Sequence, residues 1–320
     1  MQQLSRKEIG LVFMVEPGHY EWPAILLASS LLAFAQDKVR LYAYCRAHLI
    51  DQLHSDTVAF FEKYGIELRA ITPEFEVIYP QGNKLYACAD KRPEQATILF
   101  DTDMFQLRPY LLAEAFRPGC VSGRPTGDWM WGKTVEEWAL AYQSVDLEMP
   151  LKRMARASGS YVAPTISAGF VAYDHPDFGQ IWTDVALEIE QKRLAKGIYP
   201  TLDQISLPVA SVKADLGIHM LDVGWNKAGK IKPQALRDTI CYHYQHAKTL
   251  LDLPVKWMAD KLLQDFAGFD SCEDLIAFYD RESAKPADVL HNKGFREKII
   301  LPQRDVDERH DTSRPGRPKA

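Results

Sequence analysis

The stretch Ala96-Thr97-Ile98-Leu99-Phe100-Asp101-Thr102-Asp103 (ATILFDTD) joins an apolar run directly to two carboxylates spaced one residue apart. The first five residues predict a buried strand, because they are mostly apolar and bounded by polar residues. Asp101 and Asp103 follow where this strand ends, and carboxylates beside an apolar core cost free energy unless a partner compensates them. The fold and the function therefore both depend on what lies between Asp101 and Asp103.

Strand and helix patterns alternate along the chain around this stretch. We expect strands in the apolar or alternating runs 9–15, 39–45, 66–71, 96–100, 161–174 and 241–250. We expect helices at 22–36, 56–65, 83–90, 177–193, 255–266 and 271–280. This alternation predicts an α/β fold, a mainly parallel sheet with helices on both faces, whose ligands bind beyond the carboxyl ends of the strands.

Composition and charge limit the partners of this chain. A net charge of −5 and a pI near 6.0 argue against nucleic acid, because phosphate binding needs a basic surface. The five cysteines are widely spaced and form no C-x-x-C pair, so we expect neither a zinc ribbon nor a disulfide framework. The apolar run 24–35 is too short to span a bilayer. We expect a cytoplasmic protein, with peripheral membrane contact left open.

The acidic pair has two interpretations. Mg²⁺ and Mn²⁺ prefer carboxylate and phosphate oxygens, so Asp101 and Asp103 could hold one ion that bridges to a diphosphate. Alternatively, Asp101 caps a turn and Asp103 is solvated. His243, at the end of a late expected strand, would supply an imidazole as third ligand, and Lys248 would meet a phosphate as a point charge.

Several segments, taken in order, resemble one enzyme family. They are LVFMV (11–15) with His19-Tyr20 after it, NKLYACAD (83–90), ILFDTD (98–103), ISAGFVAYD (166–174), LDQISL (202–207), LDVGWN (221–226) and YHYQHAK (242–248). Over roughly residues 8 to 250 the sequence resembles the nucleotide-sugar glycosyltransferases of the GT-A fold, in particular the retaining galactosyl- and glucosyltransferases of family 8.

The resemblance implies a fold, a cofactor and a set of site residues. It implies a GT-A domain over 1–250. The helical patterns after it predict an extension over 251–302 packed on this domain, and the charged, proline-containing composition of 303–320 predicts a disordered tail. The resemblance also implies Mn²⁺, or Mg²⁺, held by Asp101, Asp103 and His243. Donor contacts would come from Lys84, Asp101, Asp103, Ser167, Ala168, Gly169, His243 and Lys248, and catalytic roles would fall to Lys84, Asp203 and Gln204.

The function implied is transfer of a hexose from a nucleotide-diphosphate sugar, with UDP as the expected carrier, to a glycan, lipid or small-molecule acceptor with retention. Four features depart from the family pattern. Glu16 replaces an Asp, Ser167 replaces an Asn, His246 stands near a usual Gly, and the spacing from His243 to Lys248 is one residue shorter than in the family. The alternative is therefore a GT-A domain that binds its ligand without turnover. Phosphatases of the haloacid dehalogenase type also place D-x-D after a buried strand. Their motif usually continues with a Gly-Thr pair, whereas Met104-Phe105 follow it here, which argues against a phosphatase.

The tryptophans after the acidic pair also allow two interpretations. Trp129 and Trp131 lie beside glycines, so their rings could stack on an acceptor sugar or simply pack against a helix. Trp138 and Tyr142 follow helical spacing with Trp131, which favours packing for those two.

Overall fold

The computed structural model of the chain describes residues 8–127, 130–152, 154–155, 159, 161–229, 231 and 233–282. Trp129 and the predicted tail 303–320 lie outside these residues. Within them, the strand expected at 96–100 is β4 (Ala96–Phe100), and all five of its residues are buried.

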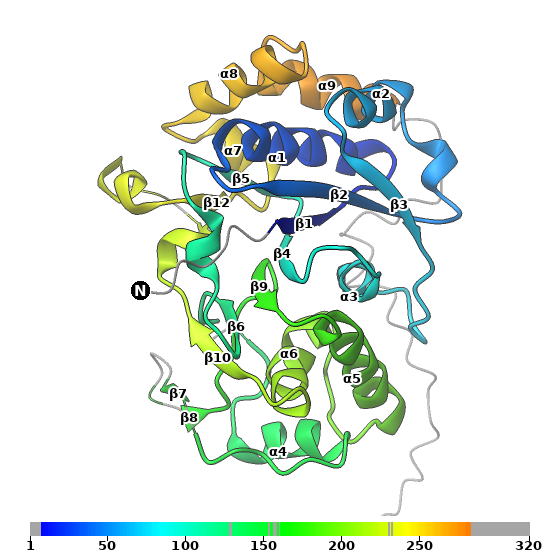
Figure 1. The fold of residues 1–320 in the computed structure, drawn as a ribbon, viewed down its shortest axis with the longest axis vertical. Helices are drawn as coiled ribbons and strands as arrows, with labels where there is room; N and C mark the ends of the chain where they lie inside the picture. The colour runs from blue at the N-terminus through cyan, green and yellow to red at the C-terminus, as the bar shows by residue number, and fades with distance from the viewer. Residues whose placement is uncertain are drawn as a thin grey trace, which may run out of the picture. The chain divides into compact units, whose positions relative to one another are not determined.

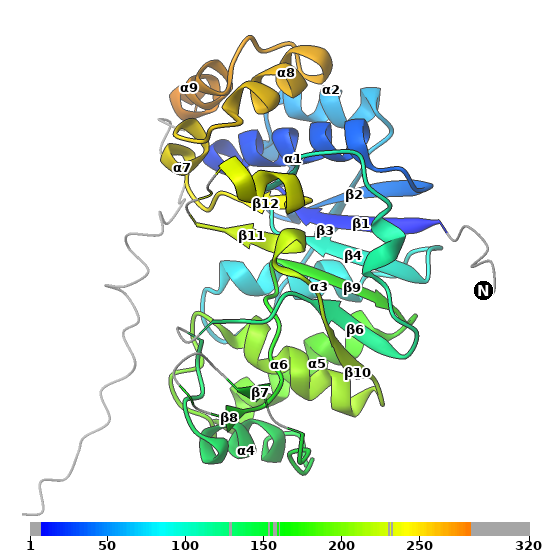
Figure 2. The ribbon, with the colours of Figure 1, turned by 90° about the vertical axis from the view of Figure 1, so that its left-hand side faces the viewer.

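β4 is the central strand of a seven-stranded sheet of order β10-β6-β9-β4-β1-β2-β3 (Figures 1 and 2). Its other strands are β1 (Ile9–Met14), β2 (Val39–Arg46), β3 (Glu67–Ile71), β6 (Cys120–Gly123), β9 (Phe170–Asp174) and β10 (Gly217–Met220). β9 is antiparallel to both of its neighbours, β4 and β6, whereas the remaining pairs are parallel. The predicted mixed, mainly parallel α/β sheet is confirmed.

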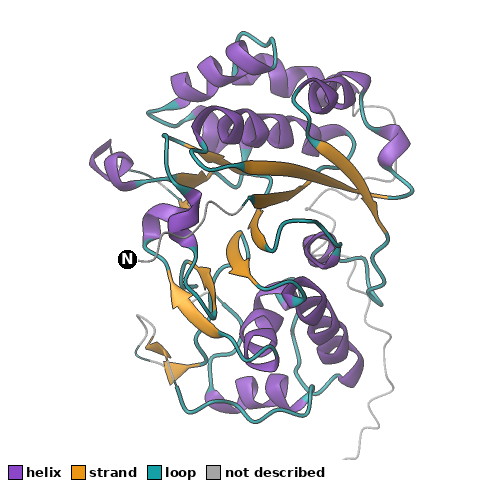
Figure 3. Cartoon of the chain, in the orientation of Figure 1, coloured by secondary structure: helices purple, strands orange, loops and turns teal. Residues whose placement is uncertain are grey.

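Helices cover both faces of this sheet (Figures 1 and 3). One face carries α1 (Glu21–Phe34), α2 (Ser55–Lys63), α7 (Ala247–Leu251), α8 (Lys256–Phe266) and α9 (Cys272–Glu282). The other carries α3 (Asn83–Ala89), α5 (Phe178–Lys192) and α6 (Leu202–Lys213), and α4 (Val135–Gln143) packs against α6. In β1, Leu11 and Phe13 belong to the first core and Val12 to the second, as the alternation of a strand requires.

α1 is apolar around most of its circumference because it is buried between the sheet and the C-terminal helices α8 and α9. The helices predicted at 255–266 and 271–280 thus exist and share one core with α1. The division of the chain at residue 250 stays a prediction. Among the described residues, no helix has the length and hydrophobicity that a transmembrane span requires.

A small three-stranded sheet completes the edge where β4 ends. It has the order β11-β12-β5, with β5 (Met104–Gln106), β11 (Lys227–Ala228) and β12 (Cys241–His243). A separate pair consists of β7 (Met154–Ala155) and β8 (Tyr161–Val162). β5 begins directly after Asp103, so the small sheet lies next to the acidic pair.

Two strand predictions are too long. In 161–174 only β8 and β9 are strands, because Pro164 offers no N–H to a ladder and the chain bends between them. In 241–250 the strand ends at His243, and α7 follows after Gln245, whose φ of 64° no strand accommodates. α6 is not among the helices predicted above, and Pro208 lies inside it, where proline is disfavoured.

Candidate functional site

Asp101, Asp103 and His243 form one cluster at the carboxyl end of β4. One ligand atom from each residue lies within 4.8 Å of the others. His243 Nε2 is 2.9 Å from Asp103 Oδ1. The three residues that the sequence proposes as metal ligands are therefore neighbours in space, although His243 lies far from the acidic pair in the sequence.

Backbone hydrogen bonds fix this cluster. β12 pairs antiparallel with β5, so His243 lies opposite Met104, the residue after Asp103. The N–H of Tyr244 donates to the carbonyl of Asp103 at 3.0 Å, and the N–H of Asp101 donates to the carbonyl of Gly169 at 2.7 Å. The positions of both carboxylates thus follow from strand pairing rather than from a flexible loop.

Gly169 is a glycine for reasons of space. Its φ lies in the ordinary range, but a Cβ there would lie 2.9 Å from Asp101 Oδ2, 3.1 Å from Asn226 Nδ2 and 3.1 Å from His243 Cε1. The ligand cluster occupies the volume that any larger residue would fill. The sequence placed Gly169 among the donor contacts, whereas the structure places it directly against the acidic cluster.

Asn226 orients the imidazole of His243. Its Oδ1 is 3.1 Å from His243 Nδ1, and its Nδ2 donates to Ser167 Oγ at 3.3 Å. An amide oxygen that accepts from Nδ1–H leaves Nε2 facing Asp103 and the ligand cluster. Asn226 was not among the predicted site residues, although the segment LDVGWN contains it.

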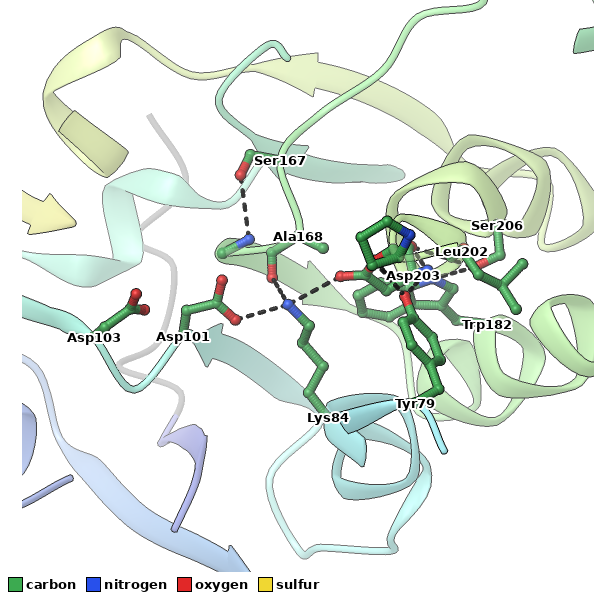
Figure 4. Close-up of polar contacts among 12 residues, drawn as sticks. Tyr79, Lys84, Asp101, Asp103, Ser167, Ala168, Trp182, Leu202, Asp203 and Ser206 are labelled. Carbon is green, nitrogen blue, oxygen red and sulfur yellow. Dashed lines mark hydrogen bonds and ion pairs between the residues drawn. The ribbon is translucent and has the colours of Figure 1, made fainter. Parts of the chain in front are cut away.

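Lys84 connects the acidic cluster to a second carboxylate (Figure 4). Its buried ammonium lies 2.7 Å from Asp101 Oδ1, 3.0 Å from Asp203 Oδ2 and 3.2 Å from the carbonyl of Ala168. Three acceptors match the three protons of an ammonium group. Lys84, Ala168 and Asp203, which the sequence assigned to donor binding and catalysis, are thus brought together, but Lys84 is fully occupied within the protein.

Asp203 lies in the first turn of α6, where two aromatic side chains from other elements hold it (Figure 4). Tyr79 donates its hydroxyl to Asp203 Oδ1 at 2.7 Å and accepts from the N–H of Asp203 at 2.9 Å. Trp182 donates its indole N–H to the carbonyl of Asp203 at 3.0 Å. Nothing in the sequence pattern singles out Tyr79, because its contact with Asp203 joins positions 124 residues apart.

Burial and opposite charges act against one another at these groups. Burial raises the pKa of Asp101, and Lys84 and His243 only partly offset it. Burial opposes the charged form of Asp103 too, but there His243 outweighs it and the pKa of Asp103 is lowered. Burial opposes the imidazolium of His243, whereas Asp103 and Asp101 together raise its pKa. The pKa of Lys84 is raised for the same reason, because the negative charges of Asp101 and Asp203 outweigh the effect of burial.

The remaining predicted residues differ in burial and in hydrogen-bond partners. Gln204 follows Asp203 on α6, and its buried Oε1 has no hydrogen-bond partner among the described residues. Lys248 is exposed on α7. Trp131 donates its indole N–H to the carbonyl of Lys196 at 2.7 Å and packs edge to face on Trp138. Trp138 and Tyr142 are buried, as expected for packing residues.

Residues 127–134 (GDWMWGKT) also match the phosphate-binding pattern G-x-x-x-x-G-K-[ST] at the start of α4. That pattern needs a strand running directly into the loop, whereas β6 ends at Gly123. Lys133 Nζ donates to the carbonyl of Met130 at 2.8 Å, and the Trp138 indole donates to the carbonyl of Gly132 at 3.0 Å. The described part of this loop is thus engaged in packing, and it does not support a triphosphate site.

Glu16, at the end of β1, is also fully engaged. Arg46 donates Nε to Glu16 Oε1 at 2.8 Å and Nη2 to Glu16 Oε2 at 2.9 Å. Asn83 Nδ2 adds a further hydrogen bond to Glu16 Oε1 at 2.9 Å. A bidentate arginine pair of this kind fixes the carboxylate in one orientation at the ligand edge of the sheet.

The residues present fit a divalent ion. Two carboxylates and one imidazole form a donor set that suits Mn²⁺ or Mg²⁺, and Asn226 supports the imidazole from behind. The close approach that Gly169 permits brings these groups together without a side chain between them. No other described group of three or more His, Cys, Asp or Glu residues has this geometry.

Comparison with known proteins gives one family match. The sequence profile of a family described as the Rhodobacterales glycosyltransferase domain matches residues 11–215, which is more than half of the chain. Among curated protein sequences, none is similar to this chain.

Solved structures show weak similarity. A crystal structure of the galactosyltransferase LgtC with donor and acceptor sugar analogs has a TM-score of 0.49 and 12% identity, and covers 81% of this chain and 95% of that one. An active-site mutant of LgtC has a TM-score of 0.47 and 14% identity, with the same coverage. Mouse xyloside xylosyltransferase 1, in its apo form, has a TM-score of 0.42 and 11% identity, and covers 74% of this chain and 97% of that one. Similarity at this level carries no inference about donor or acceptor.

Proposed function

The chain belongs to the Rhodobacterales glycosyltransferase family, and from this premise we propose that it is a metal-dependent hexosyltransferase using a nucleotide-diphosphate sugar. The family match confirms the predicted glycosyltransferase, and the sheet described above is the α/β sheet predicted with the GT-A resemblance. The proposed donor carries UDP, the proposed acceptor is a glycan, lipid or small molecule, and the proposed outcome is retention. A cytoplasmic location also stays a prediction.

The observation that carries metal dependence is the cluster of Asp101, Asp103 and His243, with ligand atoms within 4.8 Å of one another. It lies beyond the carboxyl end of β4, where sheets of this kind bind their ligands. A divalent ion held there would offset the negative charge that develops on a departing diphosphate. We propose Mn²⁺, with Mg²⁺ as the alternative, for this site.

The chain's own residues supply the remaining functions in this proposal. Lys248 is exposed on α7, five residues after His243, and its ammonium would bind a phosphate oxygen. Asp203 keeps its orientation through Tyr79 and would accept hydrogen bonds from sugar hydroxyls. Gln204 has a buried amide oxygen without a partner among the described residues, which a ligand donor could satisfy. Lys84 bridges Asp101 and Asp203 as their shared counter-charge.

The first test is a thermal-shift screen of nucleoside diphosphates and nucleotide sugars, each with and without Mn²⁺. A ligand that binds the native state raises the melting temperature by mass action. We expect a shift with a uridine diphosphate ligand that needs Mn²⁺ and is lost in Asp103→Asn. Asp184→Asn, which changes an exposed carboxylate on α5, should keep it. Unchanged binding in Asp103→Asn would remove the metal assignment.

A domain that binds the donor without turnover is the second candidate. Lys84 has three partners within the protein, and Ser167 is shorter than the Asn of the resembling family. Release of the nucleoside diphosphate from the donor, measured with Mn²⁺ and no added acceptor, separates the two candidates. Slow release above the uncatalysed rate supports the enzyme, whereas binding with no release in any acceptor screen supports the binding domain.

A further inference from the structure

Arg124 lies at the same edge of the sheet as the acidic cluster. It follows β6 directly, and β6 runs in the same direction as β4 because both are antiparallel to β9. The N–H of Ser167 donates to the carbonyl of Arg124 at 2.8 Å, and Pro125 bridges to Ile166. Arg124 and Ser167 are thus cross-strand partners whose side chains share one face, with Cβ atoms about 5 Å apart.

One contact ties the guanidinium to the support of His243. Arg124 Nη1 donates to the carbonyl of Asn226 at 2.9 Å. The side chain of the same Asn226 contacts Ser167 Oγ and His243 Nδ1. Arg124 is therefore one residue removed from the proposed metal ligands, on the side of Ser167.

The charge of Arg124 has no counter-charge in the described part of the protein. No described carboxylate lies within 4.0 Å of its nitrogens, and the remaining N–H groups have no described acceptor. Burial lowers the pKa of its guanidinium. By contrast, the partly buried Arg46 and Arg69 are each paired with carboxylates. A half-buried cation without a partner costs free energy that a bound anion would recover.

We propose that Arg124 recognises an anionic group, a carboxylate or phosphate, carried by the transferred sugar or by the acceptor. This inference rests on the proposed function, since it places the anion beside a nucleotide-sugar site. The free edge of a guanidinium matches such oxygens with two parallel hydrogen bonds. Asn226 lies between Arg124 and His243, so the anion is distinct from the diphosphate assigned to the metal cluster.

The donor arm of the test measures binding of UDP, UDP-glucose and UDP-glucuronic acid to the full chain by calorimetry, each with Mn²⁺. If the sugar carries the anion, the wild-type chain binds UDP-glucuronic acid about tenfold or more tightly than UDP-glucose. R124Q abolishes this preference and keeps the wild-type affinity for UDP. R117Q, which removes an exposed arginine before β6, keeps the preference.

The acceptor arm measures binding of glucose, glucuronate and glucose 6-phosphate with Mn²⁺, both with and without UDP. If the acceptor carries the anion, the wild-type chain prefers one of the two anionic sugars by about tenfold or more, and R124Q abolishes that preference. R124K keeps the charge without the planar fork and should retain part of it. A preference in either arm that depends on Arg124 supports the inference and identifies its source.

Three results would overturn the inference. They are the absence of an anion preference in both arms, a preference that R124Q keeps, and a loss of UDP affinity in R124Q, which would assign Arg124 to the diphosphate or to the support of Asn226. Failure of the proposed function gives a different pattern, because in that case neither the wild-type chain nor any variant binds UDP in the presence of Mn²⁺. The acceptor arm without UDP still tests Arg124 in that case.

Discussion

Lys84 Nζ lies 2.7 Å from Asp101 Oδ1 and joins a proposed metal ligand to Asp203, whose Oδ2 is 3.0 Å away on its other side. The ammonium and both carboxylates are largely withdrawn from water. Each charge is stable there only because the others are present. The site is therefore a connected network from Tyr79 through Asp203, Lys84 and Asp101, not a set of independent side chains.

Removing Lys84 should destabilise the fold strongly. Lys84→Met leaves the buried Asp203 and the partly buried Asp101 without their shared counter-charge, and breaking a buried pair in this way costs about 3–5 kcal/mol. Urea unfolding at neutral pH measures the difference. Lys91→Met removes one partner of an exposed ion pair with Asp177 and should leave the unfolding free energy nearly unchanged. Equal losses in both variants would mean that Lys84 is not the counter-charge that we describe.

Gly169→Ala should weaken metal binding more than it weakens the fold. The new Cβ would lie 2.9 Å from Asp101 Oδ2 and 3.1 Å from His243 Cε1, so the ligands must move apart. We expect Mn²⁺ affinity, measured by calorimetry, to fall about tenfold or more, as for a disturbed outer shell. Gly10→Ala is the matched control, since a Cβ on β1 meets its nearest atoms at an ordinary 3.6 Å. An unchanged Mn²⁺ affinity in Gly169→Ala would contradict the cluster geometry.

Asn226→Ala should lower Mn²⁺ affinity through His243 alone. Without the amide oxygen 3.1 Å from Nδ1, the imidazole loses the partner that fixes its orientation. Residues in this position typically contribute 10- to 100-fold to metal affinity, about the range we expect here. Ser167→Ala removes a contact on the other side of Asn226 and should affect Mn²⁺ much less. If the two variants lose equal affinity, Asn226 does not act by orienting His243.

The sequence predicts the sheet better than the network around it. ATILF reads as a buried strand because every residue of β4 faces a core, and the acidic pair reads as a ligand edge because it follows that strand directly. Asn226, Tyr79 and Arg124 could not be singled out in the same way. Each acquires its role through a contact between distant segments, such as Tyr79 with Asp203 across 124 positions, which no local periodicity encodes.

Tyr79→Phe should reveal how much Asp203 depends on one hydroxyl. The change leaves Asp203 Oδ1 and the Asp203 N–H buried without this partner, and an unsatisfied buried group costs about 1–3 kcal/mol. Donor affinity and turnover report whether Asp203 also loses its orientation toward the sugar. Tyr86→Phe is the control, because its hydroxyl accepts from the Glu74 N–H in an exposed loop. Stability equal to the wild-type value in Tyr79→Phe would show that the Tyr79 hydroxyl does not hold Asp203.

Glu21 should make the protein less stable as the pH rises above its ordinary pKa of 4.5. It is buried at the start of α1, and burial raises its pKa although Thr57, Gly18 and His54 donate to it. Between the ordinary and the raised pKa the folded chain binds a proton that the unfolded chain has released. The contribution is therefore complete below the ordinary value and is lost as pH rises through the folded value. Because Glu21→Gln cannot titrate, the unfolding free energy of the wild type minus that of the variant should fall with pH and then level off. Urea unfolding of both proteins from pH 4.5 upward measures this difference, and a difference that rises with pH would show that the three donors outweigh burial.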